Sequence, residues 1–148
     1  IYEGTNAIQA NDFMFRKTIR DNGKAAKELL DEIKIDCDDN FEMSQMVTLT
    51  SKSLDYILEN RDDQEMLSCI SFDYLMGFGY LVGGWLMDKA KRSAKEQLSK
   101  TSINEIFLKS KIVSAEFYDF HILPRIDYHL KVVMKGAKVV QTANDSFI

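Results

Sequence analysis

The stretch that decides the fold is residues 67–85, which read LSCISFDYLMGFGYLVGGW. Its large apolar side chains recur every three or four residues, which is the spacing of one face of an α-helix. They are Leu67, Ile70, Tyr74, Phe78, Leu81 and Trp85. Asp62 or Asp63 can cap the start of this helix, and the sequence turns polar from Lys89 onward. The pattern therefore predicts a long helix with one buried face.

Four glycines, Gly77, Gly79, Gly83 and Gly84, lie within this helical pattern. A glycine inside a helix lowers its stability by about 1 kcal/mol relative to alanine, so four of them need a reason. Close approach of a neighbouring helix is one reason, with Trp85 filling the space beside the groove. The alternatives are a break in the helix at the glycines, or an exposed apolar patch that meets a partner.

The sequence on either side predicts more helices and no strands. It holds a single proline, Pro124, and no sustained alternation of apolar and polar residues. Helical patterns run from about Asn6 to Arg20, Ala25 to Ile35, Met43 to Asn60 and, with Ser102 as N-cap, Ile106 to Phe120. Asn22-Gly23 ends the first pattern, because both residues tolerate the left-handed conformation, and the acidic stretch 36–40 ends the second. Pro124 ends or kinks the last long helix, or starts a final one that runs to Lys135-Gly136, and residues 143–148 read as a tail.

Five or six helices with short polar connections are best buried together as an all-α, up-and-down helical bundle. We expect the bundle to extend from about Lys24 to Lys138. Asn22-Gly23 is the best candidate for a domain boundary, which assigns residues 1–22 to a preceding domain and residues 23–148 to a self-contained bundle. Because the chain opens on Ile1, we also expect it to be a piece of a longer protein.

Composition excludes several classes of function. The formal net charge is −4 and no basic stripe is visible, which argues against nucleic acid as a partner. The most apolar stretch, Tyr74 to Met87, is shorter than the roughly 20 residues of a membrane span, so no span is expected. Cys37 and Cys69 are too few for a disulfide scaffold and read as free thiols in a reducing, cytoplasmic compartment.

The bundle itself offers little chemistry. A di-iron site of helical bundles needs Glu-x-x-His pairs, but Tyr118 and Ile126 stand three residues before His121 and His129. We therefore expect no metal site and read both histidines as structural. The short run Met76-Gly77-Phe78-Gly79 lacks the third glycine of a dinucleotide fingerprint and lies in a helical pattern. The aromatic residues of this region are read as core.

The N-terminal segment, unlike the bundle, carries a motif that points to a function. Residues 1–9, IYEGTNAIQ, resemble the segment of the flavin-dependent acyl-CoA dehydrogenases that carries their catalytic glutamate. Two later segments, FGYLVGGWLM at 78–87 and FYDFHILPR at 117–125, resemble the additional C-terminal helical domain found in one branch of that family. The first match continues with Ala10, Asp12, Arg16 and Lys17. The resemblance spans almost the whole chain.

The resemblance implies an α,β-dehydrogenation of an acyl-CoA thioester to a 2-enoyl-CoA, as in fatty acid metabolism, with FAD as cofactor. It assigns the catalytic base to Glu3 and a substrate contact to Gly4. Thr5, Asn6, Ala7 and Gln9 are implied to lie along the FAD, although glycine often stands where this chain has Ala7. Residues 1–22 would then be the end of the catalytic domain. An electron-transfer flavoprotein and a second copy of the chain are the implied protein partners.

Alternatives of other classes stay open. From spacing alone, Glu3 reads as a solvated carboxylate in the first turn of a helix, where the helix dipole stabilises it. The bundle could be a non-catalytic interaction or oligomerisation module, which is compatible with a parent that is the enzyme. A ligand-binding bundle unrelated to dehydrogenases is a third possibility. Without the rest of the flavin and substrate pockets, the chain by itself is expected to be inactive.

Overall fold

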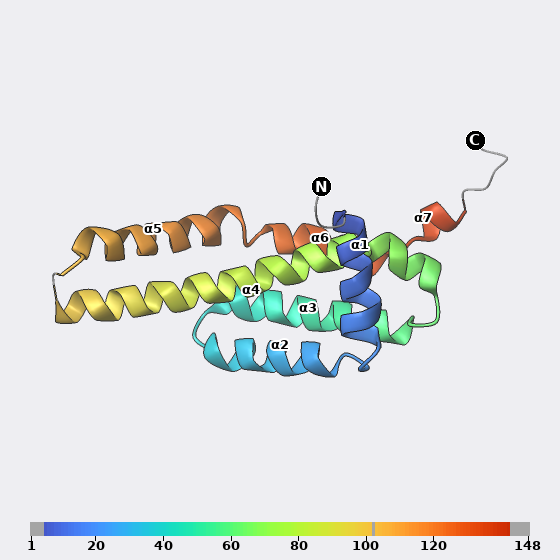
Figure 1. The fold of residues 1–148 in the computed structure, drawn as a ribbon, viewed down its shortest axis with the longest axis horizontal. Coiled ribbons are helices and arrows are strands. Elements are labelled where there is room, and N and C mark those ends of the chain that lie inside the picture. Colours follow the sequence, from blue (N-terminus) through green and yellow to red (C-terminus); the bar gives the residue numbers. More distant parts are fainter. Residues whose placement is uncertain (1–4, 102, 143–148) are drawn as a thin grey trace.

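The computed structural model describes residues 5–101 and 103–142, and these form helices joined by short turns, with no strand among them. In chain order the helices are α1 (Asn6–Asn11), the π-helix η1 (Asp12–Ile19), α2 (Lys24–Asp36), α3 (Phe41–Glu59), α4 (Gln64–Lys100), α5 (Glu105–His121), α6 (Arg125–Lys135) and α7 (Lys138–Gln141). The all-α bundle predicted from the sequence is confirmed. Helices α2, α3, α4 and α5 alternate in direction, and α6 continues onward from the end of α5 (Figure 1).

The long helix α4 organises the molecule, because every other long element packs on it or on its neighbours. It runs without interruption from Gln64 to Lys100, so the alternative of a break at the glycines is wrong. The Asp63 side chain accepts a hydrogen bond from the Met66 N–H at 2.9 Å, which is the predicted cap. The Asn40 side chain caps α3 in the same way, accepting from the Met43 N–H at 3.2 Å.

Three of the four glycines permit close contact between helices. A Cβ on Gly77 would lie 2.6 Å from Leu130 of α6, and one on Gly84 would lie 2.7 Å from Leu123. At Gly83 it would overlap the Tyr118 hydroxyl of α5. Gly79 is the exception, because nothing of the described chain comes within 4 Å of such an atom. The glycine face, at Gly77, Gly83 and Gly84, is therefore a packing surface.

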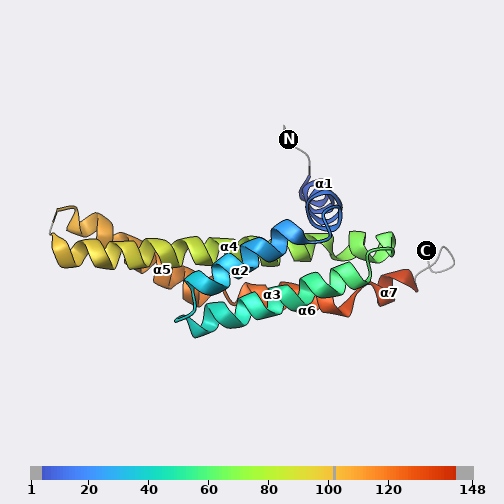
Figure 2. The same cartoon turned by 90° about the horizontal axis from the view of Figure 1, so that it is seen from below.

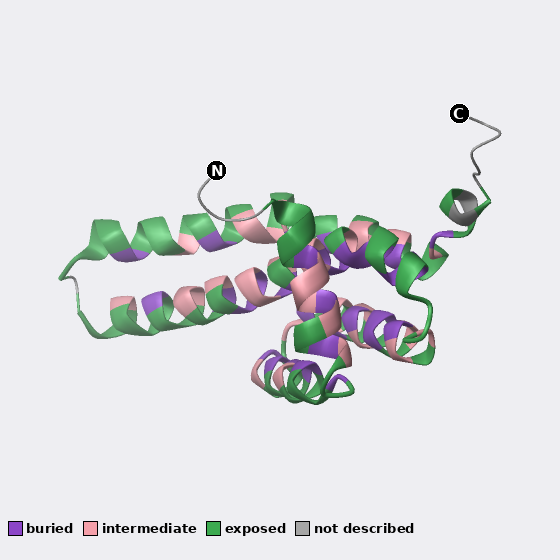
Figure 3. Ribbon diagram, turned by 45° about the vertical axis from the view of Figure 1, so that its right-hand side comes forward, coloured by how far each residue is buried: buried purple, intermediate pink, exposed green. Residues whose placement is uncertain are grey.

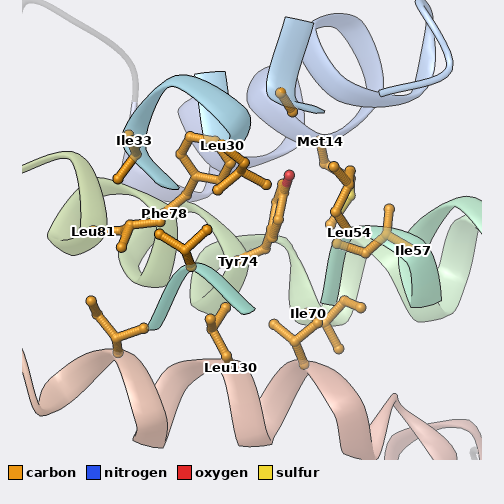
Figure 4. Packing of buried hydrophobic residues seen from close by; sticks show 14 of the residues in the cluster. Met14, Leu30, Ile33, Leu54, Ile57, Ile70, Tyr74, Phe78, Leu81 and Leu130 are labelled. Carbon is orange, nitrogen blue, oxygen red and sulfur yellow. The ribbon is translucent and has the colours of Figure 1, made fainter. Parts of the chain in front are cut away.

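The core lies where α2, α3, α4 and α6 meet. Tyr74 and Phe78 of α4 stand at its centre, with Leu30 of α2, Leu54 of α3 and Leu130 of α6 around them (Figure 4). Met14 of η1 is fully buried in the same cluster. The first helix, which consists of α1 and η1 together, therefore contributes to the core of the bundle.

The second half of α4 and the whole of α5 form a two-helix arm that extends past the other helices (Figure 1). Within this arm the buried positions are few, and they include Ala94 of α4 and Leu108 and Ala115 of α5. Lys91 of α4 and Asp119 of α5 tie its base together with an ion pair of 3.1 Å. Buried residues become fewer along the arm toward its tip (Figure 3).

Details at several helix ends differ from the sequence predictions. The turn before α5 uses Asn104, in the left-handed conformation at φ 61°, and the predicted cap Ser102 lies outside the described residues. Pro124 starts α6, which was one of the two outcomes expected of it. The short helix α7 was not predicted, and the predicted tail 143–148 lies outside the described residues.

Candidate functional site

The segment implied to carry catalysis lies at the start of α1. Glu3 and Gly4, the predicted base and substrate contact, lie outside the described residues. Thr5 is the N-cap of α1, with extended backbone at φ −66° and ψ 157°, and its carbonyl oxygen accepts from the N–H groups of Ile8 and Gln9. Its hydroxyl forms no capping hydrogen bond within α1.

The four predicted cofactor contacts, Thr5, Asn6, Ala7 and Gln9, are all exposed, and the structure brings them together on the first turn and a half of α1. The first N–H groups of a helix have no partner inside the helix, and they favour anionic oxygens. A hydroxyl, two carboxamides and these N–H groups form a donor set that fits the phosphate and ribose oxygens of a flavin dinucleotide.

The rest of this helix is held firmly against the bundle. Ala10 is fully buried, and the Asn11 side chain accepts a hydrogen bond of 2.8 Å from the hydroxyl of Ser71 on α4. The Phe13 ring packs 5.3 Å from Tyr74 and 5.4 Å from Phe78, measured between ring centroids. Because of these contacts the helix crosses α4 and appears end-on beside it (Figure 2). The direction of this helix is therefore set by α4.

The regular helix changes to a π-helix at Asp12, directly after the exposed first turns. At its end the Arg20 N–H bonds to the Phe15 carbonyl at 3.2 Å, and the Gly23 N–H bonds to the Thr18 carbonyl at 2.8 Å. Asn22 and Gly23 then take positive φ angles of 57° and 73°, so the left-handed turn predicted at these two residues is confirmed. Turns of the π-helix type are frequent at functional sites, and no pattern in the sequence predicted this one.

A second group of polar residues joins α2 to the middle of α4. The carboxylate of Asp36 accepts a hydrogen bond of 2.6 Å from the indole N–H of Trp85 and pairs with Lys89 and Arg92. The Trp85 bond, followed by the two cations, holds the pKa of Asp36 below its ordinary value. Trp85 is buried, as expected, and its indole N–H meets the end of α2. This network is structural.

The two cysteines differ in accessibility. Cys37 is buried beside the Asp36 network, and burial first, then nearby carboxylates, raises the pKa of its thiol to about 11. Cys69 is exposed on α4. Both are free thiols, as predicted. A thiol with a raised pKa is a poor nucleophile, so Cys37 acts as a packed core residue.

The two histidines have different surroundings. His129 lies with its Nδ1 atom 2.7 Å from a carboxylate oxygen of Asp73, in a setting of aromatic rings. His121 is exposed and stacks on Phe117. Within residues 5–101 and 103–142 no three His, Cys, Asp or Glu side chains are placed to hold a metal ion. The Asp73–His129 pair was not visible in the sequence, since its members stand on different helices.

A hollow opens where α3 meets the junction of α5 and α6. Phe120, Leu123 and Pro124 form its apolar wall, while Glu42, Asp119 and Asp127 place carboxylates around it. Phosphate groups carry the same sign of charge as these carboxylates. The hollow is therefore a poor place for coenzyme A or a flavin dinucleotide.

The helix α4 is long and apolar enough to span a membrane by length and composition, and 44% of the relevant window is buried inside the molecule. Leu67, Ile70, Tyr74 and Leu81 of this helix are core residues. Packing within the bundle thus accounts for part of the apolar character of α4.

Comparison with known protein families supplies the identity of the fold. Residues 21–143 match the family described as Acetyl-CoA dehydrogenase C-terminal like. The chain belongs to this family. The match covers α2 to α7, and so includes the glycine face, the Asp36 network and the two-helix arm.

Two curated proteins resemble this member of the Acetyl-CoA dehydrogenase C-terminal like family over most of its length. A broad-specificity linear acyl-CoA dehydrogenase, FadE5 of Mycobacterium tuberculosis, is 29% identical in an alignment 152 residues long that covers 90% of this chain and 25% of that protein. The 3-methylmercaptopropionyl-CoA dehydrogenase of Ruegeria pomeroyi is 30% identical in an alignment 135 residues long that covers 83% of this chain and 23% of that protein. The chain thus spans about a quarter of the length of these relatives.

Proposed function

We propose that this chain is the C-terminal part of an FAD-dependent acyl-CoA dehydrogenase that converts an acyl-CoA thioester to a 2-enoyl-CoA. The observation that carries the proposal is the family match over residues 21–143, together with two relatives that are both acyl-CoA dehydrogenases. The N-terminal segment IYEGTNAIQ supports it, because that segment supplies a carboxylate next to a set of ligand-binding groups.

Glu3 is the proposed base. The α-proton of a thioester is only weakly acidic, so its removal requires a carboxylate placed beside it in a dry pocket, where desolvation raises the carboxylate pKa. FAD, when bound, supplies the acceptor for the hydride that leaves the β-carbon. Gly4 has no side chain and allows the substrate to approach the backbone closely. Thr5, Asn6, Ala7 and Gln9 are proposed to hold the FAD through the exposed start of α1.

The proposal extends to partners and location. An electron-transfer flavoprotein would reoxidise the flavin, and a second copy of the chain would complete a homo-oligomer in the cytoplasm. The rest of the flavin and acyl-CoA pockets would be formed by sequence that precedes this segment in the parent protein. The alternative function, a non-catalytic interaction module, is favoured for part of the surface by the exposed outer face of α5. The two functions are compatible within one parent enzyme.

The decisive experiment uses the full-length parent protein. Purified parent should be yellow from bound flavin, and anaerobic titration with acyl-CoAs of several chain lengths should bleach the flavin band with one length class. The Glu3→Gln parent should stay yellow and fail to bleach, because the amide cannot take the proton. A parent that binds no flavin would overturn the enzyme assignment, and unchanged turnover of Glu3→Gln would remove Glu3 from the mechanism.

A further inference from the structure

The outer face of α5 carries a row of exposed apolar side chains. Their exposed fractions range from 58% at Phe117 to 87% at Ile106. We call this row the α5 seam; it consists of Ile106, Ser110, Val113, Phe117 and Phe120. Successive members are four, three, four and three residues apart, which is the heptad spacing of a helix that pairs with another helix. Leu108 and Ala115, which pack on α4, lie on the opposite side of α5.

No described part of this chain covers the seam. It lies along the arm that extends past the other helices (Figures 1 and 3). Single exposed apolar residues are common, but four at heptad positions on one face of a helix are typical of an interface. The polar surface of α4 at the same end of the molecule shows that the arm is not apolar throughout.

The seam is complementary to itself when two copies of α5 run antiparallel. In the register that aligns the two rows, Ile106 faces Phe117 of the partner subunit. Ser110 faces the partner's Val113 at the centre. Each outer layer combines an aliphatic side chain with a larger aromatic one, which allows both to interdigitate. The same contacts are repeated on both sides of a two-fold axis, as an isologous dimer requires.

The charges beside the seam favour the same arrangement. Lys109 and Glu116 flank the row on one side and are both exposed. The antiparallel register places Lys109 next to the partner's Glu116, and the two-fold axis repeats this pair. Lys109 forms an ion pair with Glu105 of its own helix, one turn away, so its charge is already positioned on this edge. A parallel register would instead place Lys109 next to the partner's Ser114.

We propose that the α5 seam is the contact between two copies of this chain, which pair antiparallel through α5. This inference assigns a specific contact surface to the homo-oligomer of the proposed function. It does not depend on the catalytic assignment of Glu3, so the seam and the catalytic assignment can be disproved separately.

Disulfide cross-linking tests the register. All variants carry Cys69→Ser, which removes the exposed thiol. In the antiparallel pair the two copies of residue 113 lie about 4.5 Å apart along the helix axis, and the two copies of residue 106 about 16 Å apart. A disulfide needs Cα atoms within about 7 Å. Val113→Cys should therefore give a cross-linked dimer under mild oxidation, and Ile106→Cys should not. Efficient cross-linking of Ile106→Cys would indicate parallel pairing and overturn the proposal.

Sedimentation of the 148-residue chain tests the contact itself. We expect a monomer–dimer equilibrium whose dissociation constant rises at least tenfold for Val113→Glu and for Glu116→Lys. The double variant Lys109→Glu, Glu116→Lys should recover most of the lost affinity, because it exchanges the charges of each pair. Equal helicity by circular dichroism shows that each variant is folded. A chain that stays monomeric at high micromolar concentration and fails to cross-link through Val113→Cys contradicts the proposal, including the case in which it binds lipid vesicles through the seam.

The same cysteine variants in the full-length parent separate the two proposals. Cross-linking through Val113→Cys supports the seam whether or not the flavin is bleached by acyl-CoA. A parent whose flavin is bleached but whose Val113→Cys variant does not cross-link retains the proposed function and overturns the seam. In that outcome another part of the parent polypeptide covers this face of α5.

Discussion

At the scale of single residues, the contact between Gly83 and Tyr118 shows how α5 is held against α4. The Tyr118 hydroxyl donates a hydrogen bond of 3.0 Å to the Tyr80 carbonyl, and it occupies the space that a side chain at position 83 would need. Burial, and to a smaller extent the neighbouring Tyr80, raises the pKa of Tyr118, so the phenol stays protonated and able to donate. The absence of a side chain at Gly83 thus permits a specific hydrogen bond between helices.

Two alanine substitutions in α4 should therefore act in opposite directions. Gly83→Ala should lower the free energy of unfolding by about 1–2 kcal/mol, because the new methyl group displaces Tyr118 and this exceeds the gain in helix propensity. Gly79→Ala, at the open position, should raise it by about 0.5–1 kcal/mol. Urea denaturation followed by circular dichroism measures both. Equal effects of the two substitutions would mean that the Tyr118 contact contributes nothing.

Asp36 makes stability depend on pH in a defined direction. Its pKa is lowered from the ordinary value of 3.8, chiefly by the Trp85 N–H. A carboxylate whose pKa is lower in the folded state stabilises the fold at pH values above its unfolded-state pKa. This stabilisation is lost as the pH falls through its folded-state pKa. Asp36→Asn should be less stable than wild type at pH 7, and the difference should shrink below about pH 3.8. Urea midpoints at several pH values test this, with the exposed Asp31→Asn as control; a difference that grows toward low pH contradicts the assignment.

At the scale of elements, the first helix and α4 form a continuous packed unit. Phe13 contributes most of the aromatic contact, with Tyr74 on one side and Phe78 on the other. Phe13→Ala should lower the free energy of unfolding by about 2–3 kcal/mol and should speed amide exchange in residues 6–19 more than in α3. Hydrogen exchange with mass spectrometry reads this out, and Phe41→Ala, at an exposed position, is the matched control. Uniform acceleration across all helices would show that the first helix has no separate docking energy.

The helices could be predicted from the sequence because their signals are local. The periodicity of residues 67–85, the aspartate before them and Asn22-Gly23 each set a boundary through nearby side chains and backbone angles. The docking of the first helix could not be predicted in this way, since it depends on Asn11 meeting Ser71, 60 residues away. The π-helix and α7 were missed because neither has a distinctive local pattern.

The candidate site was predicted from a resemblance and not from geometry. The residue pattern alone leaves Glu3 as an ordinary carboxylate near a helix start. The structure adds that Thr5, Asn6, Ala7 and Gln9 lie exposed together at the beginning of α1, and their contact with a cofactor stays a prediction. The polar pairs Asp73–His129 and Asp36–Trp85 were missed because their partners lie 56 and 49 residues apart in the chain.

At the scale of the whole molecule, the core is complete within this chain, whereas the proposed cofactor site is open to solvent. The core residues Met14, Tyr74 and Leu130 pack on one another within this chain, so the fold needs no other segment at its centre. The start of α1, in contrast, is open to solvent on the described residues that would contact FAD. A few hydrogen bonds at an open helix start are weak in water, since they replace bonds to solvent of similar strength.

The 148-residue chain should therefore fold cooperatively and yet bind flavin poorly. Thermal unfolding should be a single transition, as expected for one core of this size. FAD added at tens of micromolar should show no saturable change in fluorescence, and acyl-CoA should cause no bleaching, because binding energy beyond the level of a millimolar dissociation constant, about 4 kcal/mol, must come from surfaces outside this chain. The full-length parent under the same conditions is the control. Tight flavin binding by the chain alone would mean that the start of α1 forms a complete cofactor site, and it would move the catalytic machinery into the segment that this chain already contains.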